Sequence, residues 1–345
     1  MQQRIAWIDI LKGIGILLVV FGHITPDGTA KTFIYSFHMP LFFFVSGYVF
    51  DPYRHLQYRD FFIKRFKSII LPFILFYMLS HIVSLIISSV LASQPLAAIH
   101  YYHPLLGLLI ANGEWTQAVN NVPLWFLPCL FITVNILYLL RVSFQFSITK
   151  LAVALLIISL LAFMESKYMT ASLPWMLDTA LTAVVFSGCG LIAKTIQHDG
   201  LKFLPRSRAS AVALFLAFLG VTIYFSFANG RVDMNTRHYG NYFLFYGAAV
   251  SGILACALLA RAMPPIPVLS YVGMHSITIL VLHLPFSQMS VALFDGLFLW
   301  YMDIPVNYIL NGNIWAVIIS GMTIMQIIVI LRLLDKYYSL TPSRK

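Results

Sequence analysis

One apolar stretch carries the residues best suited to acid–base chemistry. Between Ile8 and His23 nearly every side chain is apolar, yet the stretch contains Asp9, Lys12 and His23. In a helix, Lys12 and His23 return to within roughly 20° of one face and lie about 16 Å apart along the axis. Asp9 lies one turn before Lys12 and is predicted to neutralise it. One face therefore carries a cation at one end and, at the other, a titratable base suited to general-base chemistry.

Two further imidazoles each precede a proline by two residues. His38 stands before Pro40, and His283 before Pro285, both in apolar segments. A proline inside a helix frees the carbonyl one turn back, which a bilayer tolerates only where protein or a cavity satisfies it. Either the histidines merely satisfy these breaks, or they belong to a site with His23. The residues alone leave both interpretations open.

A basic and aromatic run, RDFFIKRFKSIILPF, occupies residues 59–73. Lys64, Arg65 and Lys67 lie in it and form a patch that could hold phosphate oxygens, since guanidinium groups match them well. Anchoring to lipid headgroups is an equal alternative. Further along, Trp125 stands between two prolines and is either an interfacial anchor or the aromatic wall of a sugar site.

The elements that position these residues are spanning helices. Of the 345 residues, 60% are hydrophobic and only 10% are charged, whereas a soluble domain carries about 25% charged residues. This excludes an ordinary soluble enzyme and predicts an all-α polytopic membrane protein in a single domain, 1–345. A spanning helix needs roughly 20 mostly apolar residues. Ten segments qualify: 5–25, 33–50, 68–92, 123–140, 151–164, 176–196, 209–228, 242–261, 270–290 and 314–334.

The distribution of basic residues predicts the orientation. If both chain ends are cytoplasmic, the inner regions hold 18 of the 22 Lys and Arg residues, as the positive-inside rule requires. The net charge of +10 is then topogenic and faces membrane lipid, and it does not indicate nucleic-acid binding. The segment 296–310 is expected to be an interfacial loop. Cysteines without any CxxC pattern indicate neither a disulfide nor a metal site.

These segments resemble the membrane acyltransferase-3 family, and most closely its fucose-4-O-acetylase-like branch. The resemblance rests on Asp9, Lys12, Gly13 and His23 in the first helix, FHMPLFFFVSGY in the second, KRFKSIILPF after it, PLWFLP in the fourth, and the HS and HLP of the ninth. It implies about ten helices and an integral-membrane O-acyltransferase without a bound cofactor. Acetyl-CoA would be the donor, a hydroxyl of a cell-surface glycan or glycolipid the acceptor, and the inner membrane of a cell the location.

The family's functional arginine–histidine pair falls on Lys12 and His23, so a lysine replaces the arginine and loses its bidentate fork. Our hypothesis assigns catalysis to His23 and His38, support to Asp9, Lys12, Ser46 and His283, phosphate binding to Lys64, Arg65 and Lys67, and an acceptor wall to Trp125. A neutral histidine would take the proton of the attacking hydroxyl, or an acetyl-histidine relay would use the same residues.

Two other classes of function fit the same topology. A secondary transporter or exporter of a glycolipid or small anion also uses broken helices and ionisable residues within the membrane. Against it, duplicated halves are not visible and acidic residues within the spans are few. A noncatalytic scaffold would leave the costly intramembrane imidazoles without a role.

Overall fold

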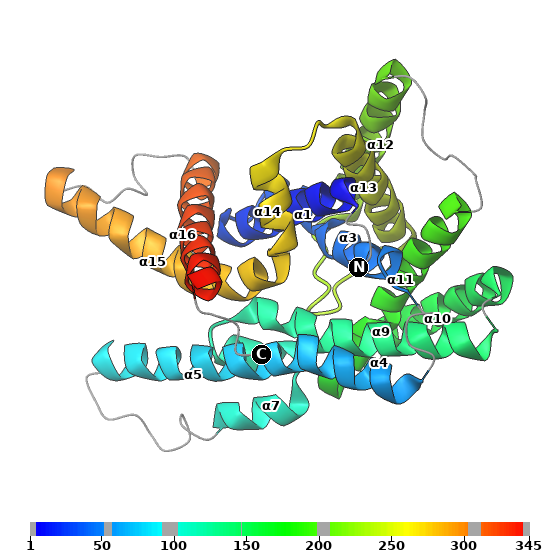
Figure 1. Cartoon of the computed structure of the whole chain (residues 1–345), viewed down its shortest axis with the longest axis horizontal. Helices are drawn as coiled ribbons and strands as arrows, with labels where there is room; N and C mark the ends of the chain where they lie inside the picture. The colour runs from blue at the N-terminus through cyan, green and yellow to red at the C-terminus, as the bar shows by residue number, and fades with distance from the viewer. Residues whose placement is uncertain are drawn as a thin grey trace. The chain divides into compact units, whose positions relative to one another are not determined.

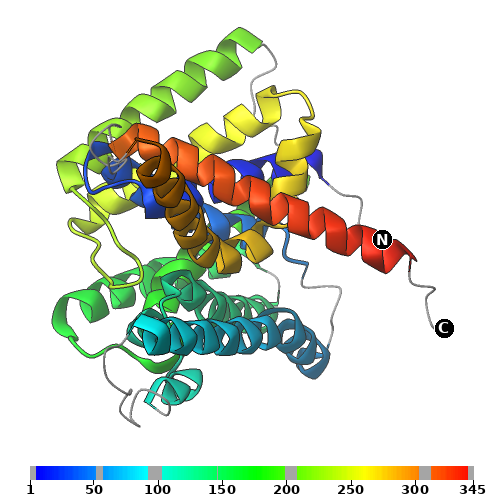
Figure 2. The same cartoon turned by 90° about the vertical axis from the view of Figure 1, so that its left-hand side faces the viewer.

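The protein is almost entirely helical where it is described. The computed structural model describes residues 5–51, 57–91, 103–145, 147–198, 208–302 and 312–340. Helices dominate these ranges (Figure 1, and Figure 2 for the view turned by 90°). Nine helices in them are long and apolar enough to cross a membrane. The predicted all-α polytopic membrane protein is confirmed.

Large apolar side chains on the outside of the bundle fit a lipid environment. Leu75 is 63% exposed, Leu156 64% and Phe243 88%. A water-facing helix would carry charged or polar groups at such positions, whereas in a bilayer apolar side chains face the acyl chains at no cost. The outward faces of these helices are therefore adapted to lipid.

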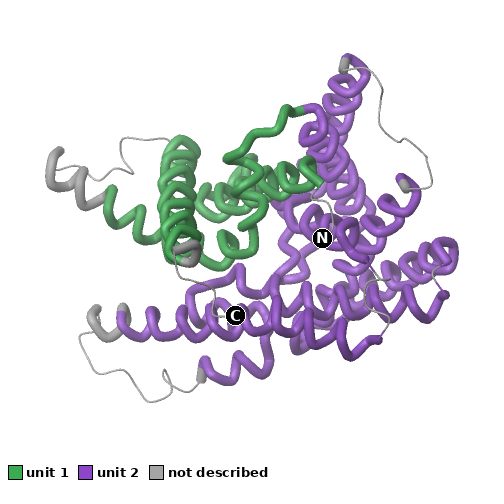
Figure 3. The backbone as a smooth tube through the Cα atoms, in the orientation of Figure 1, with its two compact units in different colours: residues 1–34, 263–345 green, residues 35–262 purple. Residues whose placement is uncertain are grey.

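The chain divides into two compact units (Figure 3). Unit 1 comprises residues 1–34 and 263–345, and unit 2 comprises residues 35–262. The helices of unit 1 are α1 (Ala6–Ile24), α14 (Pro267–Met274), α15 (Ser276–Met302) and α16 (Gly312–Leu340), with most of α2 (Thr29–Tyr35). Within this unit α1 packs against α14, α15 and α16, so the first helix of the chain is enclosed by the last three.

Unit 2 is built around a short central helix. Its helices are α3 (His38–Tyr48), α4 (Tyr58–Arg65), α5 (Leu71–Leu91), α7 (Gly107–Ile110), α8 (Gly113–Ala118), α9 (Phe126–Ser143), α10 (Ile148–Tyr168), α11 (Leu177–His198), α12 (Arg208–Asn229) and α13 (Tyr242–Ala262). The helix α3 packs against α9, α11 and α13. Gly47 and Gly190 make this close approach possible, because a Cβ at Gly47 would overlap the Ser187 carbonyl and one at Gly190 the Phe44 carbonyl.

The second predicted span, 33–50, is not one helix. The chain leaves helical geometry at Ser36 and Phe37, so α2 and α3 are separate segments of 7 and 11 residues. Pro40 explains the break, because it lacks the N–H that a continuous helix would donate to the Ser36 carbonyl. In the first turn of α3 the missing N–H costs nothing. Proline therefore starts a helix here, which corrects the predicted mid-helix kink.

The ninth predicted span also differs from its prediction. A turn at His275 separates α14 from α15, and α15 then continues through Pro285 to Met302. The expected loop at 296–310 was therefore wrong as far as Met302, because the largely apolar residues there continue the helix α15. The rest of that segment lies outside the described residues. The cytoplasmic position of both chain ends stays a prediction.

Candidate functional site

The cation and the carboxylate predicted on the first helix do lie together. In α1, Lys12 Nζ is 3.2 Å from Asp9 Oδ1. The backbone of α14 lies directly against this turn, since a Cβ on Gly273 would overlap the Asp9 carbonyl and a Cβ on Gly13 would overlap Leu269. The ion pair is thus held at a tight contact between α1 and α14, and the predicted neutralisation of Lys12 is confirmed.

At the other end of α1, His23 faces His283 of α15. The two ring centres are 5.1 Å apart and the ring planes are inclined at 51°. His283 is fully buried, whereas His23 is partly exposed. The structure therefore brings together two of the three imidazoles singled out in the sequence, both within unit 1.

His283 is held in one tautomer by its own helix. Its Nδ1 lies 2.7 Å from the Leu280 carbonyl oxygen. A carbonyl only accepts, so Nδ1 carries the hydrogen and Nε2 carries the lone pair. Among the described residues Nε2 has no hydrogen-bond partner. An unpaired buried acceptor costs about 1–3 kcal/mol, so this nitrogen calls for a functional explanation.

Polar side chains also gather where α15 and α16 pack together in unit 1. Ser290 Oγ contacts Gln326 Oε1 at 3.1 Å and Thr323 Oγ1 at 3.4 Å. Near the end of α1, Thr25 Oγ1 donates to Asn313 Oδ1 of α16 at 2.8 Å. Hydrogen bonds between hydroxyl and amide groups stabilise helix contacts in a membrane, so they fix the helices that carry the two histidines.

The third imidazole, His38, belongs to unit 2. It is 3% exposed, in the first turn of α3, and its ring centre is 4.8 Å from that of Tyr35. The guanidinium of Arg231 lies over the ring of Tyr35, 5.1 Å from the ring centre. His38 is thus part of a stacked aromatic and cationic group, and its predicted pairing with His23 stays a prediction.

Ser46 lies in the packing between two helices. Its hydroxyl donates to the Phe43 carbonyl at 2.7 Å and lies 3.1 Å from the hydroxyl of Ser187. Ser187 donates to the same carbonyl at 2.8 Å. These contacts join α3 to α11 beside Gly47, so the geometry of Ser46 serves helix packing.

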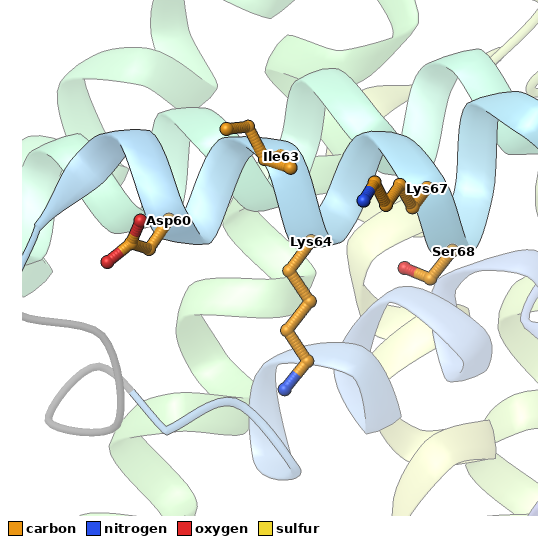
Figure 4. A pocket seen from close by; sticks show the side chains of 5 residues that line it. All are labelled: Asp60, Ile63, Lys64, Lys67 and Ser68. Carbon is orange, nitrogen blue, oxygen red and sulfur yellow. The ribbon is translucent and has the colours of Figure 1, made fainter. Parts of the chain in front are cut away.

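The basic run forms an open pocket on one helix face. Asp60, Ile63, Lys64, Lys67 and Ser68 line a hollow of about 490 Å³, and their side chains are displayed along α4 and the π-helical turn Phe66–Ile70 that follows it (Figure 4). Their spacing of three, four, seven and eight residues marks one helical face. This periodicity could have added Asp60 and Ser68 to the predicted set.

Arg65 does not line this pocket. Its guanidinium lies 5.3 Å from the ring centre of Phe61, which is a cation–π distance. Two of the three predicted phosphate ligands, Lys64 and Lys67, therefore share the pocket, and Arg65 packs on another side of the helix.

Trp125 ends the short turn Val122–Trp125 that precedes α9 and is only 5% exposed. Its ring meets that of Phe126 edge to face, with centres 6.3 Å apart. The indole is therefore packed within unit 2, and its assignment as an acceptor wall stays a prediction.

A buried ionic cluster of Arg237, Asp178 and Glu165 was not predicted from the sequence. Arg237 pairs with Glu165 and lies 3.5 Å from Asp178. Asp178 also accepts the backbone N–H groups of Leu173 at 2.8 Å and Thr179 at 2.7 Å. Asp178 thus caps the start of α11, and its ion pair with Arg237 ties it to the loop after α12.

The loop that carries Arg237 is itself well packed. Tyr239 is 3% exposed, and burial raises the pKa of its phenol well above the usual value because the phenolate would lose its hydration.

Among the described residues no three His, Cys, Asp or Glu side chains are grouped so that they could hold a metal ion.

Comparison with known proteins identifies one family. The model of the acyltransferase domain family, acyltransferase-3, matches residues 5–333 and therefore nearly the whole chain. The match includes His23, His283 and the pocket that Lys64 and Lys67 line. Neither the curated proteins nor the solved structures contain a match to this sequence.

Proposed function

This chain belongs to the acyltransferase-3 family and is a multi-pass membrane acyltransferase, and from that premise we propose that it moves acetyl from acetyl-CoA to a hydroxyl of a glycan. The acceptor is a cell-surface or lipid-linked glycan, and the site of action is the inner membrane. Acetyl-CoA is a substrate, and the reaction uses no resident cofactor. The observation that carries the proposal is the contact of His23 with His283, two intramembrane imidazoles that a purely structural bundle would not need.

The transfer step is assigned to His23. Its neutral imidazole takes the proton of the acceptor hydroxyl while the hydroxyl oxygen attacks the thioester carbonyl carbon. The C–S bond then breaks, the thiolate of CoA leaves and the imidazolium returns the proton to it. In the alternative relay, His23 carries the acetyl group before the hydroxyl receives it. His38 is proposed as a second catalytic imidazole that either bonds the tetrahedral oxyanion when it is protonated or orients the first histidine.

Binding of the donor phosphates is assigned to Lys64 and Lys67. Lys64, Lys67 and Ser68 line one open pocket, and two cationic side chains with a serine hydroxyl are suited to the oxygens of a phosphate group. Asp60 in the same pocket favours a ligand that also donates a hydrogen bond, as the ribose and pantetheine of CoA do. Lys12 is already paired with Asp9, so these two residues are proposed to support the site and not to bind phosphate.

The proposal is tested with purified protein in liposomes. The wild type and His23→Ala meet [acetyl-14C]-CoA with and without a membrane glycolipid extract, and CoA binding is measured in parallel. We expect label in the glycolipid with the wild type only, and equal CoA binding by both proteins. His81→Leu is the matched control, since His81 is another buried histidine, in α5, outside the proposed site. Transfer by His23→Ala at the wild-type rate would remove His23 from the mechanism, and absence of CoA binding by the wild type would overturn the proposal.

A further inference from the structure

We infer that His283 is a positioning residue for His23, which it orients by accepting a hydrogen bond on its buried Nε2. The inference deepens the proposed function and rests on it. His283 then acts as a hydrogen-bond acceptor for His23, and both residues belong to unit 1.

The lone pair of the His283 ring is on Nε2. Because Nδ1 donates to the Leu280 carbonyl, Nε2 is the acceptor nitrogen of the ring. It is fully buried, and no described residue donates to it. A buried acceptor of this kind is poised for a donor that lies close by.

The rings of His23 and His283 are already at the separation that a hydrogen bond between them requires. Two imidazoles joined by an N–H···N bond of about 2.9 Å have ring centres about 5 Å apart. The centres of His23 and His283 are 5.1 Å apart. The bond therefore needs a change of ring orientation only, and neither α1 nor α15 has to move.

A hydrogen bond to His283 would fix the tautomer of His23. When one ring nitrogen of His23 donates its hydrogen to His283, the other nitrogen must carry the lone pair. His23 is then a base of fixed tautomer and fixed direction, and its imidazolium is stabilised while it holds the substrate proton. This is how an orienting acceptor assists a histidine base in general.

A purely structural role for His283 would require a different atom of its side chain. In that case only the Nδ1–H bond to Leu280 matters, because it supports the helix near Pro285. Asparagine can place its amide N–H near the Nδ1 position but has no atom at Nε2. Glutamine can place its amide oxygen near the Nε2 position but gives up the Nδ1 donor. His283→Asn and His283→Gln therefore separate the two roles.

The test is acetyl transfer by the full chain in liposomes, with kcat and the KM for acetyl-CoA measured for each variant. We expect His283→Asn to lower kcat by about 10²-fold, the lower range of what a positioned proton transfer contributes, with KM unchanged. We expect His283→Gln to retain most of the rate. His81→Asn and His81→Gln are the matched controls and should leave kcat unchanged. A wild-type rate in His283→Asn, or an equal loss in both His283 variants, overturns the inference.

A second arm keeps the inference testable where His283→Gln melts at a lower temperature than the wild type. In the His23→Ala background, His283→Asn should cause no further loss of the residual rate, since residues that act as a unit are not additive. A further loss as large as in the wild-type background contradicts the inference. The proposed function fails separately, when His23→Ala itself transfers acetyl at the wild-type rate.

Discussion

Replacement of Arg237 by methionine should strongly destabilise unit 2. The guanidinium is 10% exposed and the carboxylates of Asp178 and Glu165 are 2% and 9% exposed. Without Arg237 both carboxylates stay buried without a cation, and removal of one partner from a buried ion pair costs about 3–5 kcal/mol. For a unit of this size each kcal/mol lowers the melting temperature by about 2–4 °C, which gives a total fall of roughly 6–20 °C. Arg237 also donates to the Thr170 carbonyl at 3.0 Å, so the loop after α12 would loosen as well.

The assay is the apparent melting temperature of detergent-purified protein, followed by tryptophan fluorescence. Arg231→Met is the matched control, because Arg231 lies in the same loop but is 41% exposed and 3.9 Å from Asp233. Such a surface pair contributes about 1 kcal/mol or less. The triple variant with Asp178→Asn and Glu165→Gln should regain part of the loss. If Arg237→Met melts within roughly 2 °C of the wild type, the reasoning on buried charge is refuted.

Three further predictions follow from the two units. Gly273→Val should lower expression and melting temperature, because its side chain would overlap the Asp9 carbonyl, whereas Gly321→Val, with open space at the Cβ position, is the control. The double variant Lys64→Ala and Lys67→Ala should raise the KM for acetyl-CoA and weaken its dependence on salt, with kcat nearly unchanged; an unchanged KM would remove this pocket from donor binding. Burial raises the pKa of Tyr239, so its contribution to stability is complete below about pH 10 and is lost above it as the unfolded phenol ionises. Tyr239→Phe should therefore shift the alkaline unfolding midpoint to higher pH. An unshifted midpoint would contradict this.

The features that the sequence predicts well are those fixed by local geometry. The Asp9–Lys12 contact follows from a three-residue spacing on one helix, and it is found. The spanning helices follow from long apolar runs, and α10 is even longer than the predicted 151–164. Both properties depend only on neighbours along the chain, so a helical period and a hydropathy window are enough to identify them.

The features that the sequence missed depend on residues far apart in the chain. Arg237 pairs with Glu165 across 72 positions, and no periodicity links the two. Its neighbourhood does give one indirect signal. Of the four basic residues on the predicted outer side, Lys31 pairs with Asp27, Arg231 with Asp233 and Arg237 with two carboxylates. Three of these four basic residues thus have a carboxylate partner, and the partners of Arg237 are the most deeply buried.

The two His-x-Pro segments make the limit of local reasoning explicit. Pro40 is the third residue of α3, where it needs no N–H, and His38 consequently stands in the first turn beside Tyr35. Pro285 is the tenth residue of α15, and there the helix continues around it with His283 bonded to the Leu280 carbonyl. The tripeptide is almost the same, but the distance from the helix start decides whether proline lies in the first turn of a helix or in its interior. In α15 the imidazole of His283 is held in a single tautomer with a buried lone pair. The ring that carries this lone pair lies 5.1 Å from the ring of His23, centre to centre, so the structure of unit 1 connects the chemistry of His283 to His23.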